Sequence, residues 1–480
     1  MVFSTHIFLF YFLPVVLAIY YALPWVGHVA GLSEEAVSRT RNGWLLIASY
    51  GFYGWWNPWY VLLMLWVTLV SHASGLLLTQ PGAGPRQRAW VVVAAVGLSL
   101  GTLGFFKYFN FLQANLNAVL GWLGAGELRL LEVALPIGIS FYVFQALSYS
   151  LDVYRGHAPP ARSLPDFACY LALFPQLVAG PIVRYRTVAD QLVARSHGWE
   201  KFASGAALFM LGFSKKVLLA NPLGTVADAA FGAQSLGTFD AWFGVTAYAF
   251  QIYFDFSGYS DMALGLGRML GFEFLKNFNA PYHAESLTDF WRRWHISLST
   301  FLRDYLYLPL GGNRRGSRRT YLNLAVVMLL GGLWHGAHWT FVAWGAYHGA
   351  WLILERWQGK RSLYARLPHA LRVALTFGLV LVSWVFFRSA TLPEAGRYLA
   401  AMFGGGEATF AGALLAAGLY GRETTCLLVL AAGLVAQRQQ AHDWAARLTV
   451  PKAMALAVVF GVAVLAMFAQ SSNPFLYFQF

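Results

Sequence analysis

The stretch GGLWHGAHWTFVAWGAYHG, residues 331–349, places three histidines in a run of tryptophan, glycine and aliphatic residues. Its composition is typical of a membrane-buried segment, where a protonatable side chain is costly and usually functional. Gly332 and Gly336 stand close to His335 and allow backbone or ligand to approach it. We therefore predict a functional site at His335.

The composition of the whole chain indicates a membrane protein. Of 480 residues, 58% are apolar and 11% are charged, whereas about a quarter of a soluble domain is charged. About 20 apolar residues cross a bilayer as a helix, and such stretches recur along the chain. They lie near 6–26, 44–79, 89–123, 133–151, 167–182, 203–223, 239–270, 320–354, 369–390, 408–436 and 453–470. We therefore predict an all-α polytopic membrane protein, a helical bundle with roughly ten to twelve spans.

The positive charge of the chain fits this class. There are 34 Lys and Arg against 21 Asp and Glu, a net charge of +13. Basic residues accumulate in the cytoplasmic loops of membrane proteins, and the clusters at Arg86/Arg88, 314–319 and 356–372 match that pattern. We therefore predict contact with membrane lipids and no nucleic acid. A basic cytoplasmic opening would also attract the phosphates of coenzyme A or of anionic lipids.

The least hydrophobic long stretch, residues 276–319, separates strongly apolar segments. Aromatic and aliphatic residues recur between 290 and 306 at nearly helical spacing, with Arg and Ser interleaved. This pattern predicts an amphipathic helix at the interface or re-entering the bilayer, capped by Ser286 or Thr288. No soluble domain or internal repeat is evident, so we predict one integral-membrane domain over 1–480, with its catalytic core at about 240–355.

The three histidines of 331–349 can be compared on a straight helix. His338 then lies about 300° around from His335 and shares its face, while His348 lies about 220° around and roughly 20 Å along the axis. His335 and His348 would not serve one site, and we interpret His348 as a packing residue. No carboxylate or cysteine in the segment completes a metal shell for His335 and His338, so we predict no metal site.

Other polar residues in the apolar sequence are interpreted as structural. Asp255 and Asp261 are about 240° apart on a helix and do not form a carboxylate pair there. We expect them to bond neighbouring helices, with a proton relay as the alternative. Ser297 and Ser299 lack a nucleophile-elbow context, which disfavours an acyl-enzyme without excluding it.

Three segments together resemble the membrane-bound O-acyltransferase family. They are FDFSGYSDMALGLGRMLGF at 254–272, NFNAPYHAESLTDFWRRWHISLSTFLRDYLYLPLGGNR at 277–314, and GGLWHGAHWTFVAWGAYHG at 331–349. The opening MVFSTHIFLFYFLP, LFPQLVAGPIVRY at 173–185 and the ending NPFLYFQF resemble its bacterial branch that contains the alginate O-acetyltransferase membrane subunit. The resemblance therefore covers essentially the whole chain.

The resemblance implies a multi-pass enzyme of the bacterial cytoplasmic (inner) membrane. It implies transfer of an acetyl group from a cytoplasmic donor, acetyl-CoA, toward an extracytoplasmic polysaccharide such as alginate, with no permanently bound cofactor. The family's near-invariant histidine corresponds to His335, and its second polar position corresponds to His295. The family buries both in a central channel reached from opposite sides, flanked by re-entrant or interfacial helices. A separate serine-type acetyltransferase partner, periplasmic or membrane-anchored, is also implied.

The residue types suit this chemistry. Attack on a thioester needs a base for the hydroxyl proton, and histidine is well suited; we assign this role to His335. His295 would orient the acceptor or hydrogen-bond the developing oxyanion. We predict donor contacts by five nearby residues, with a salt-bridged face as an equal alternative for the charged three. The five are Asp289, Arg292, Arg293, Trp294 and Trp334.

Several alternatives remain open. The same core residues would serve O-acetylation of peptidoglycan or cellulose, or D-alanyl transfer to teichoic acid. A transporter or flippase of a glycan-linked lipid would also have many spans and buried histidines. Transporters often contain two related halves, whereas here the polar residues gather between 255 and 348.

Overall fold

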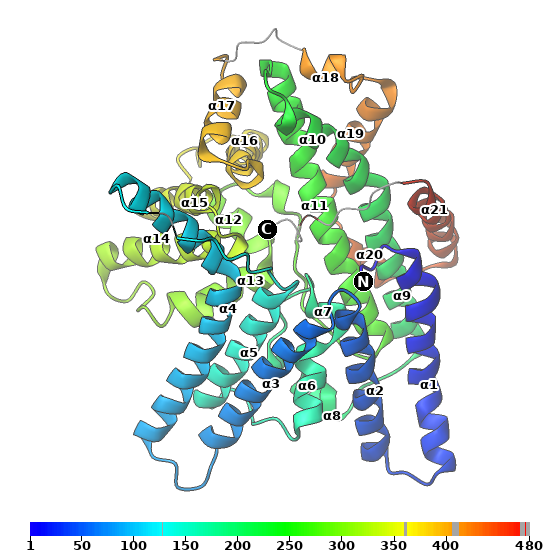
Figure 1. The fold of residues 1–480 in the computed structure, drawn as a ribbon. Coiled ribbons are helices and arrows are strands. Elements are labelled where there is room, and N and C mark those ends of the chain that lie inside the picture. The colour runs from blue at the N-terminus through cyan, green and yellow to red at the C-terminus, as the bar shows by residue number, and fades with distance from the viewer. Residues whose placement is uncertain (127, 360–361, 406–411, 471–475, 477–480) are drawn as a thin grey trace. The chain divides into compact units, whose positions relative to one another are not determined.

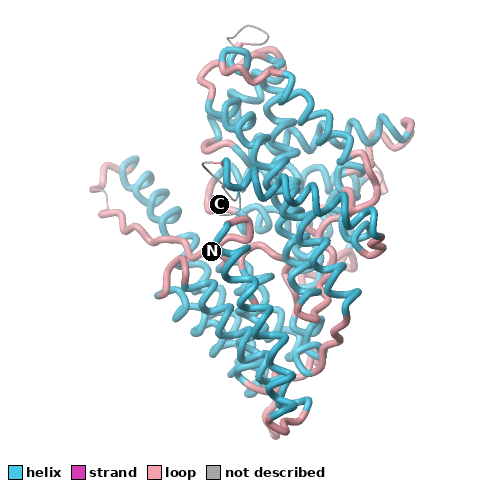
Figure 2. Tube along the Cα trace, turned by 90° about the vertical axis from the view of Figure 1, so that its right-hand side faces the viewer, coloured by secondary structure: helices cyan, strands magenta, loops and turns pink. Residues whose placement is uncertain are grey.

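The computed structural model describes residues 1–126, 128–359, 362–405, 412–470 and 476. Every regular element in these ranges is a helix, as Figures 1 and 2 show. The described chain divides into two compact units. Unit 1 contains Met1–Phe209 and Met262–Leu275, and unit 2 contains Met210–Asp261 and Lys276–Phe480. The all-α prediction is confirmed. The expectation of one domain remains a prediction.

The helices of unit 1 begin with a short π-helix and include the longest helix of the described chain. They are η1 (Phe8–Phe12), α1 (Leu13–Val29), α2 (Glu34–Gly54), α3 (Trp59–Leu78), α4 (Pro85–Trp122), α5 (Ile139–Tyr154), α6 (Leu164–Ala172), α7 (Phe174–Leu177), α8 (Tyr185–Val193) and most of α9 (Trp199–Ser214). The unit is held by aromatic packing: Phe8 and Phe12 contact Phe52 and Phe174, with ring centroids 5.3–6.3 Å apart.

Unit 2 contains most of α11 and all later helices. Its elements are η2 (Lys215–Ala220), α10 (Asn221–Gly232), α11 (Thr238–Met269), η3 (Pro281–His283), α12 (Leu287–Arg293), α13 (Ile296–Leu302), η4 (Arg303–Tyr307), α14 (Gly316–His335), α15 (Trp339–Trp357), α16 (His369–Arg388), α17 (Leu392–Met402), α18 (Ala413–Ala416), α19 (Arg422–Val435), α20 (Ala441–Ala445) and α21 (Val450–Ala469). The helices α14 and α15 lie side by side.

Six helical segments of the described chain are long and apolar enough to cross a membrane. They are Phe8–Val29, Trp59–Leu78, Pro85–Trp122, Trp199–Gly232, His369–Arg388 and Val450–Ala469. The polytopic prediction is confirmed, although fewer helices meet both criteria than the ten to twelve spans expected. Stretch 133–151 forms only the 16-residue α5, and 167–182 breaks between α6 and α7, where Pro175 begins a new helix. The stretch 408–436 lies partly outside the described residues.

Two expected helices are broken. The segment 331–349 is not one helix, because α14 ends at His335 and α15 begins at Trp339, with Gly336 and His338 in extended conformations. The amphipathic segment 290–306 is also interrupted, because His295 has a left-handed backbone with φ 44° between α12 and α13. Both breaks lie beside the predicted site residues.

Candidate active site

The α14–α15 hairpin places His335 at its turn. The two helices approach closely at glycines, as expected where small residues line a helix interface. A Cβ on Gly332 would lie 2.2 Å from the carbonyl oxygen of Phe341, and one on Gly345 would lie 2.4 Å from that of Met328. The chain therefore folds back on itself just after His335.

This fold-back corrects the geometry expected for a straight helix. Trp344 contacts the rings of both His335 and His348, at centroid distances of 5.2 and 4.8 Å. His348 is fully buried and its Nδ1 accepts a hydrogen bond from Trp291 Nε1 at 3.3 Å. His338 lies exposed in the turn, so it does not share a helix face with His335.

His295 is held in its left-handed conformation by Asn277. The side-chain oxygen of Asn277 accepts hydrogen bonds from the backbone N–H and the hydroxyl of Ser297, at 3.1 and 2.9 Å. The Asn277 carbonyl also accepts from the N–H of Ile296 at 2.9 Å. A left-handed non-glycine residue costs free energy and persists only where its surroundings impose it. Asn277 supplies that constraint.

The same contacts define the tautomer of His295. Its Nδ1 lies 3.1 Å from Asn277 Oδ1. That atom is an acceptor, because the N–H of Ser297 donates to it, so Nδ1 of His295 carries the proton. Nε2 is then unprotonated, and it is buried with no hydrogen-bond partner in the described part of the chain. Burial lowers the pKa of His295, which lies outside the six candidate spans, to about 3. The ring is therefore neutral at physiological pH.

The structure brings the two predicted catalytic histidines together. The ring centroids of His295 and His335 are 6.4 Å apart, and Trp334 packs against both. His295 is fully buried, and 6% of His335 is exposed. A neutral histidine and a second histidine thus pack against the same tryptophan.

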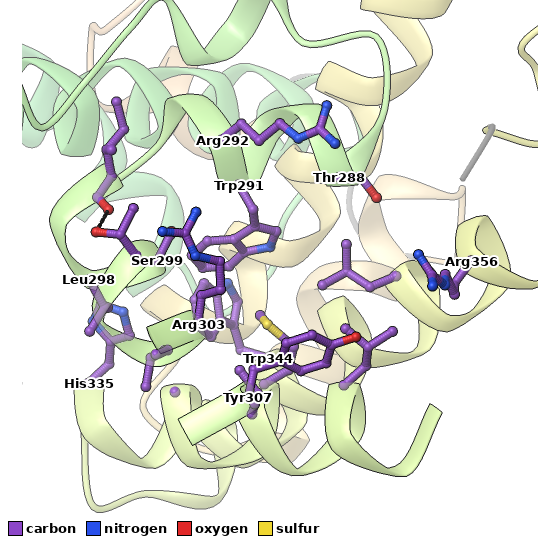
Figure 3. Close-up of a pocket in the computed structure, with 18 of the residues that line it drawn as sticks. Thr288, Trp291, Arg292, Leu298, Ser299, Arg303, Tyr307, His335, Trp344 and Arg356 are labelled. Carbon is purple, nitrogen blue, oxygen red and sulfur yellow. Dashed lines mark hydrogen bonds between the residues drawn. The ribbon is translucent and has the colours of Figure 1, made fainter. Parts of the chain in front are cut away.

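His335 opens onto a cavity of about 580 Å³ within unit 2. That volume is within the range of small-molecule sites, roughly 300–1,000 Å³. The wall is formed by Thr288, Trp291, Arg292, Ile296, Leu298, Ser299, Thr300, Leu302, Arg303, Tyr307, Asn313, Leu324, Val327, Met328, Gly331, His335, Trp344, Leu352 and Arg356. In Figure 3, His335 and Arg356 lie at opposite ends of this group.

Three arginines give the cavity a positive wall. Arg292 and Arg303 are exposed and Arg356 is half-buried. Arg303 forms an ion pair with Asp304, with Nε and Oδ1 2.7 Å apart. Among the described residues, no carboxylate lies within ion-pair distance of Arg292 or Arg356. Guanidinium groups bind phosphates well, so the cavity combines an anion-binding wall with a histidine.

Of the five residues predicted to contact the donor, Arg292 lines the cavity. Arg293 instead forms an ion pair with Asp289 at 2.9 Å. Trp294 packs among aromatic rings, including Phe278 and Trp384, both 5.1 Å away. Asp289, Arg293, Trp294 and Trp334 are not among the lining residues.

Sequence reasoning missed two residues that shape the site. One is Asn277, whose partner His295 is 18 positions away. The other is Glu355, which is 1% exposed and accepts hydrogen bonds from the backbone N–H groups of Leu287 and Thr288, both at 2.8 Å. Glu355 therefore caps the N-terminus of α12, beside the cavity residue Thr288. A lone carboxylate in the apolar sequence AYHGAWLILERW was a usable signal.

The aspartates of α11 bond to η2. Lys216 Nζ lies 2.6 Å from Asp255, and Lys215 Nζ lies 2.7 Å from Asp261. These contacts are the helix-bonding role that the sequence favoured. Ser297 donates its hydroxyl to Asn277 and so supports the turn at His295.

Comparison with known proteins agrees with this description. A model of the membrane-bound O-acyltransferase family matches residues 55–390. The chain is 45% identical to a "Probable alginate O-acetylase AlgI" of Pseudomonas putida over the full length of both chains. It is 35% identical to a peptidoglycan O-acetyltransferase of Helicobacter pylori, covering 84% of this chain and 80% of the relative. It is 28% identical to a teichoic acid D-alanyltransferase of Streptococcus thermophilus, covering 52% and 68%.

An all-helical membrane protein with a buried histidine pair beside an arginine-lined cavity has the parts of a membrane-embedded group-transfer enzyme. The chain belongs to the membrane-bound O-acyltransferase family. It is an O-acetyltransferase.

Proposed function

We propose that the protein takes an acetyl group from acetyl-CoA in the cytoplasm and moves it across the membrane for O-acetylation of an extracytoplasmic polysaccharide of the alginate type. The proposal places it in the inner membrane of a bacterium. The observation that carries it is the cavity in which His335 lies at one end and three arginines line the wall. Full-length similarity to an alginate O-acetylase supports this acceptor class.

The cavity suits an acyl-CoA. Arg292, Arg303 and Arg356 would bind its phosphates, and the apolar wall between them and His335 would hold the pantetheine chain. Trp291, Trp344 and the leucines of the wall would exclude water from the thioester.

We assign His335 as the general base. It removes the proton from the acceptor hydroxyl as the oxygen attacks the thioester carbonyl carbon, and the C–S bond breaks when the tetrahedral intermediate collapses. The coenzyme A thiolate leaves and takes the proton back from His335. The site therefore ends each turnover in its starting protonation state.

The tautomer of His295 selects one of its two expected roles. A neutral ring that donates Nδ1–H to Asn277 has no proton on Nε2, so it is unable to donate to an oxyanion. We propose instead that Nε2 accepts a hydrogen bond from a second donor group of the acceptor, which leaves the proton of the attacking hydroxyl directed toward His335. Of the two roles expected for His295, the proposal therefore favours orientation of the acceptor over binding of the oxyanion.

A partner completes the pathway. We propose that a separate protein with a serine-type acetyltransferase site receives the acetyl group and finishes the transfer to the polymer. Acetylation of purified partner by this protein, without polymer present, is the expected intermediate step.

The proposal is tested with the purified full-length protein in nanodiscs and radiolabelled acetyl-CoA. Wild type should release or transfer the label, and His335→Ala should reduce the rate by about a hundredfold or more. The matched control is His338→Ala, three residues away, exposed and outside the cavity wall. Its rate should match wild type.

Equal rates for wild type and His335→Ala would contradict a catalytic role for His335. Glycan-lipid transport in proteoliposomes would then be the activity to measure. Label on peptidoglycan but not on alginate would retain the chemistry and change the acceptor, as in the Helicobacter pylori relative.

A further inference from the structure

Unit 1 contains a second cavity, of about 550 Å³, with a wall unlike that of the first. It lies between the end of α1, the start of α2 and the chain that follows α8. It is lined by Pro24, His28, Leu32, Glu34, Glu35, Val37, Ser38, Arg41, Arg162, Val193, Ala194, Arg195 and His197. Three arginines and two histidines thus face one space.

Two of the arginines lack a neutralising carboxylate. Glu35 pairs with Arg39 and lies 3.6 Å from Arg162. In the described ranges, no carboxylate lies within ion-pair distance of Arg41 or Arg195, although Glu34 also lines the cavity. The cavity wall therefore contains two arginines whose positive charge no paired carboxylate of the described chain neutralises.

Arg41 and Arg195 are held in place by neutral groups. Both guanidinium groups lie over the ring of Tyr20, at 4.9 and 5.8 Å from its centroid. Arg195 donates to Asn42 Oδ1 at 2.6 Å and to the Tyr20 hydroxyl at 3.1 Å. Its Nη2 is buried and has no acceptor among the described residues. The guanidinium groups of Arg41 and Arg195 are thus held beside the ring of Tyr20, and Nη2 of Arg195 is available to donate a hydrogen bond to a ligand.

The positive charges of Arg41 and Arg195 also act on His197. Its Nε2 lies 2.9 Å from the hydroxyl of Tyr20, and that hydroxyl donates to the carbonyl of Leu270 at 2.7 Å. Burial, followed by the charges of Arg41 and Arg195, lowers the pKa of His197 to about 4. Burial, with the charges of Arg41 and Arg195 as the smaller contribution, thus keeps His197 neutral.

The cavity lies at the end of a membrane span. The candidate span Phe8–Val29 includes Pro24 and His28 of its wall. Trp25 beside them is 71% exposed, and Trp199, at the start of another span, is 80% exposed. Exposed tryptophans at span ends mark the depth of lipid headgroups. A phosphate at that depth would come from a lipid.

We infer that this cavity binds the phosphate of an anionic phospholipid, through the guanidinium groups of Arg41 and Arg195. Basic pockets at the ends of membrane helices recognise anionic headgroups in this way, and two guanidinium groups match the oxygen geometry of phosphate. The site is separate from the proposed acetyl-CoA cavity, since all its lining residues belong to unit 1.

The test is a titration of the full-length protein in detergent with phosphatidylglycerol, followed by native mass spectrometry. Wild type should bind phosphatidylglycerol at least about tenfold more tightly than phosphatidylcholine. Arg41→Gln should remove that preference. The matched control is Arg39→Gln on the same helix, since Arg39 is exposed, pairs with Glu35 and does not line the cavity.

Arg195→Gln is the second variant, but Arg195 also bonds Tyr20 and Asn42, so its folding is checked by thermal unfolding. Within the described residues, Arg41 has a single weak hydrogen bond, to the carbonyl of Tyr20 at 3.4 Å. Its variant carries the test alone if Arg195→Gln does not fold. An unchanged lipid preference in Arg41→Gln would overturn the inference. Displacement of the lipid by an equal concentration of inorganic phosphate would also overturn it, in favour of a free anion. Neither outcome depends on acetyl transfer.

Discussion

His295 illustrates how one amide controls a site at the scale of single residues. Asn277 Oδ1 accepts from the ring of His295 and twice from Ser297. The first contact sets the tautomer, and the other two hold the left-handed turn. The orientation of His295 toward His335 therefore depends on a residue that does not line the cavity.

Asn277→Ala should remove all three of these side-chain contacts. We expect it to destabilise the protein by about 1–3 kcal/mol, because buried donors lose their acceptor, and to lower the acetyl-transfer rate at least about tenfold. Thermal unfolding and the radiolabel assay measure the two effects. Asn279→Ala is the control, because Asn279 is exposed. A normal rate in Asn277→Ala would show that the turn does not need this amide.

The lowered pKa of His295 predicts a pH-dependent stability. The unfolded ring binds a proton below about pH 6.5, whereas the folded ring stays neutral down to about 3. Stability therefore falls as the pH decreases between these two values, by up to about 1.4 kcal/mol per pH unit. Unfolding temperatures between about pH 7 and 4 measure this slope.

His295→Asn should reduce that slope by the contribution of one ring, because asparagine does not titrate and tolerates a left-handed backbone. His197, whose pKa is also lowered, keeps its own contribution. If the variant retains activity, the pH at which its transfer rate falls to half on the acid side should equal that of wild type, since His295 stays neutral down to about pH 3. A slope equal to that of wild type would assign the pH dependence to other groups.

At the scale of elements, the α14–α15 hairpin is what brings His335 to the cavity. Its two helices touch through Gly332 and Gly345, where an added Cβ would meet a backbone carbonyl within 2.4 Å. Backbone moves less readily than a side chain. The distance between these helices is therefore set by the absence of side chains.

Gly332→Ala should separate α14 from α15 and destabilise the protein by about 1–3 kcal/mol, with loss of transfer activity. Gly349→Ala on α15 is the matched control, because its Cβ would lie 3.4 Å from Met328 Cβ, an ordinary contact. The two variants are compared by thermal unfolding in the same detergent. Equal unfolding temperatures would mean that the hairpin adjusts without cost.

The sequence predicted the all-α membrane class and the pair His295 and His335, but not the breaks that bring them together. Apolar composition reports membrane burial directly. The periodicity of 290–306 continues through His295, because a left-handed residue leaves the spacing of its neighbours unchanged. The left-handed conformation of His295 is imposed by contacts with Asn277, which lies 18 positions earlier in the sequence. A prediction from neighbouring residues does not include such a contact. Likewise, Gly332 and Gly336 indicated that another group approaches closely. They did not show that this group belongs to α15, the next helix of the same chain.

At the scale of the whole molecule, the positive charge and the exposed apolar surface suit two different kinds of contact. The net charge is +13, and Arg292, Arg303 and Arg356 place part of it along one cavity. The six apolar segments present many large exposed side chains to their surroundings. The apolar segments suit contact with lipid, and the arginines of the cavity suit the anionic donor that we propose.

Donor binding should therefore weaken with salt. Raising the ionic strength from about 0.1 to 1 M shortens the screening length from about 10 to 3 Å. We expect KM for acetyl-CoA to rise several-fold, with little change in kcat. Acetyl-pantetheine lacks the phosphate groups, so its KM should change little. A parallel rise for both donors would indicate a general salt effect and not phosphate binding at these arginines.

All the residues that line the donor cavity fall between Thr288 and Arg356, one uninterrupted stretch of chain. A recombination event that exchanged this stretch would carry the donor chamber as a unit. Acceptor preference could then diverge through the remaining segments without rebuilding the chemistry. A chimaera that keeps this stretch inside the framework of a relative should still accept acetyl-CoA while inheriting the recipient's choice of polymer. We therefore expect the proposed donor site to be transferable between relatives as one segment of chain.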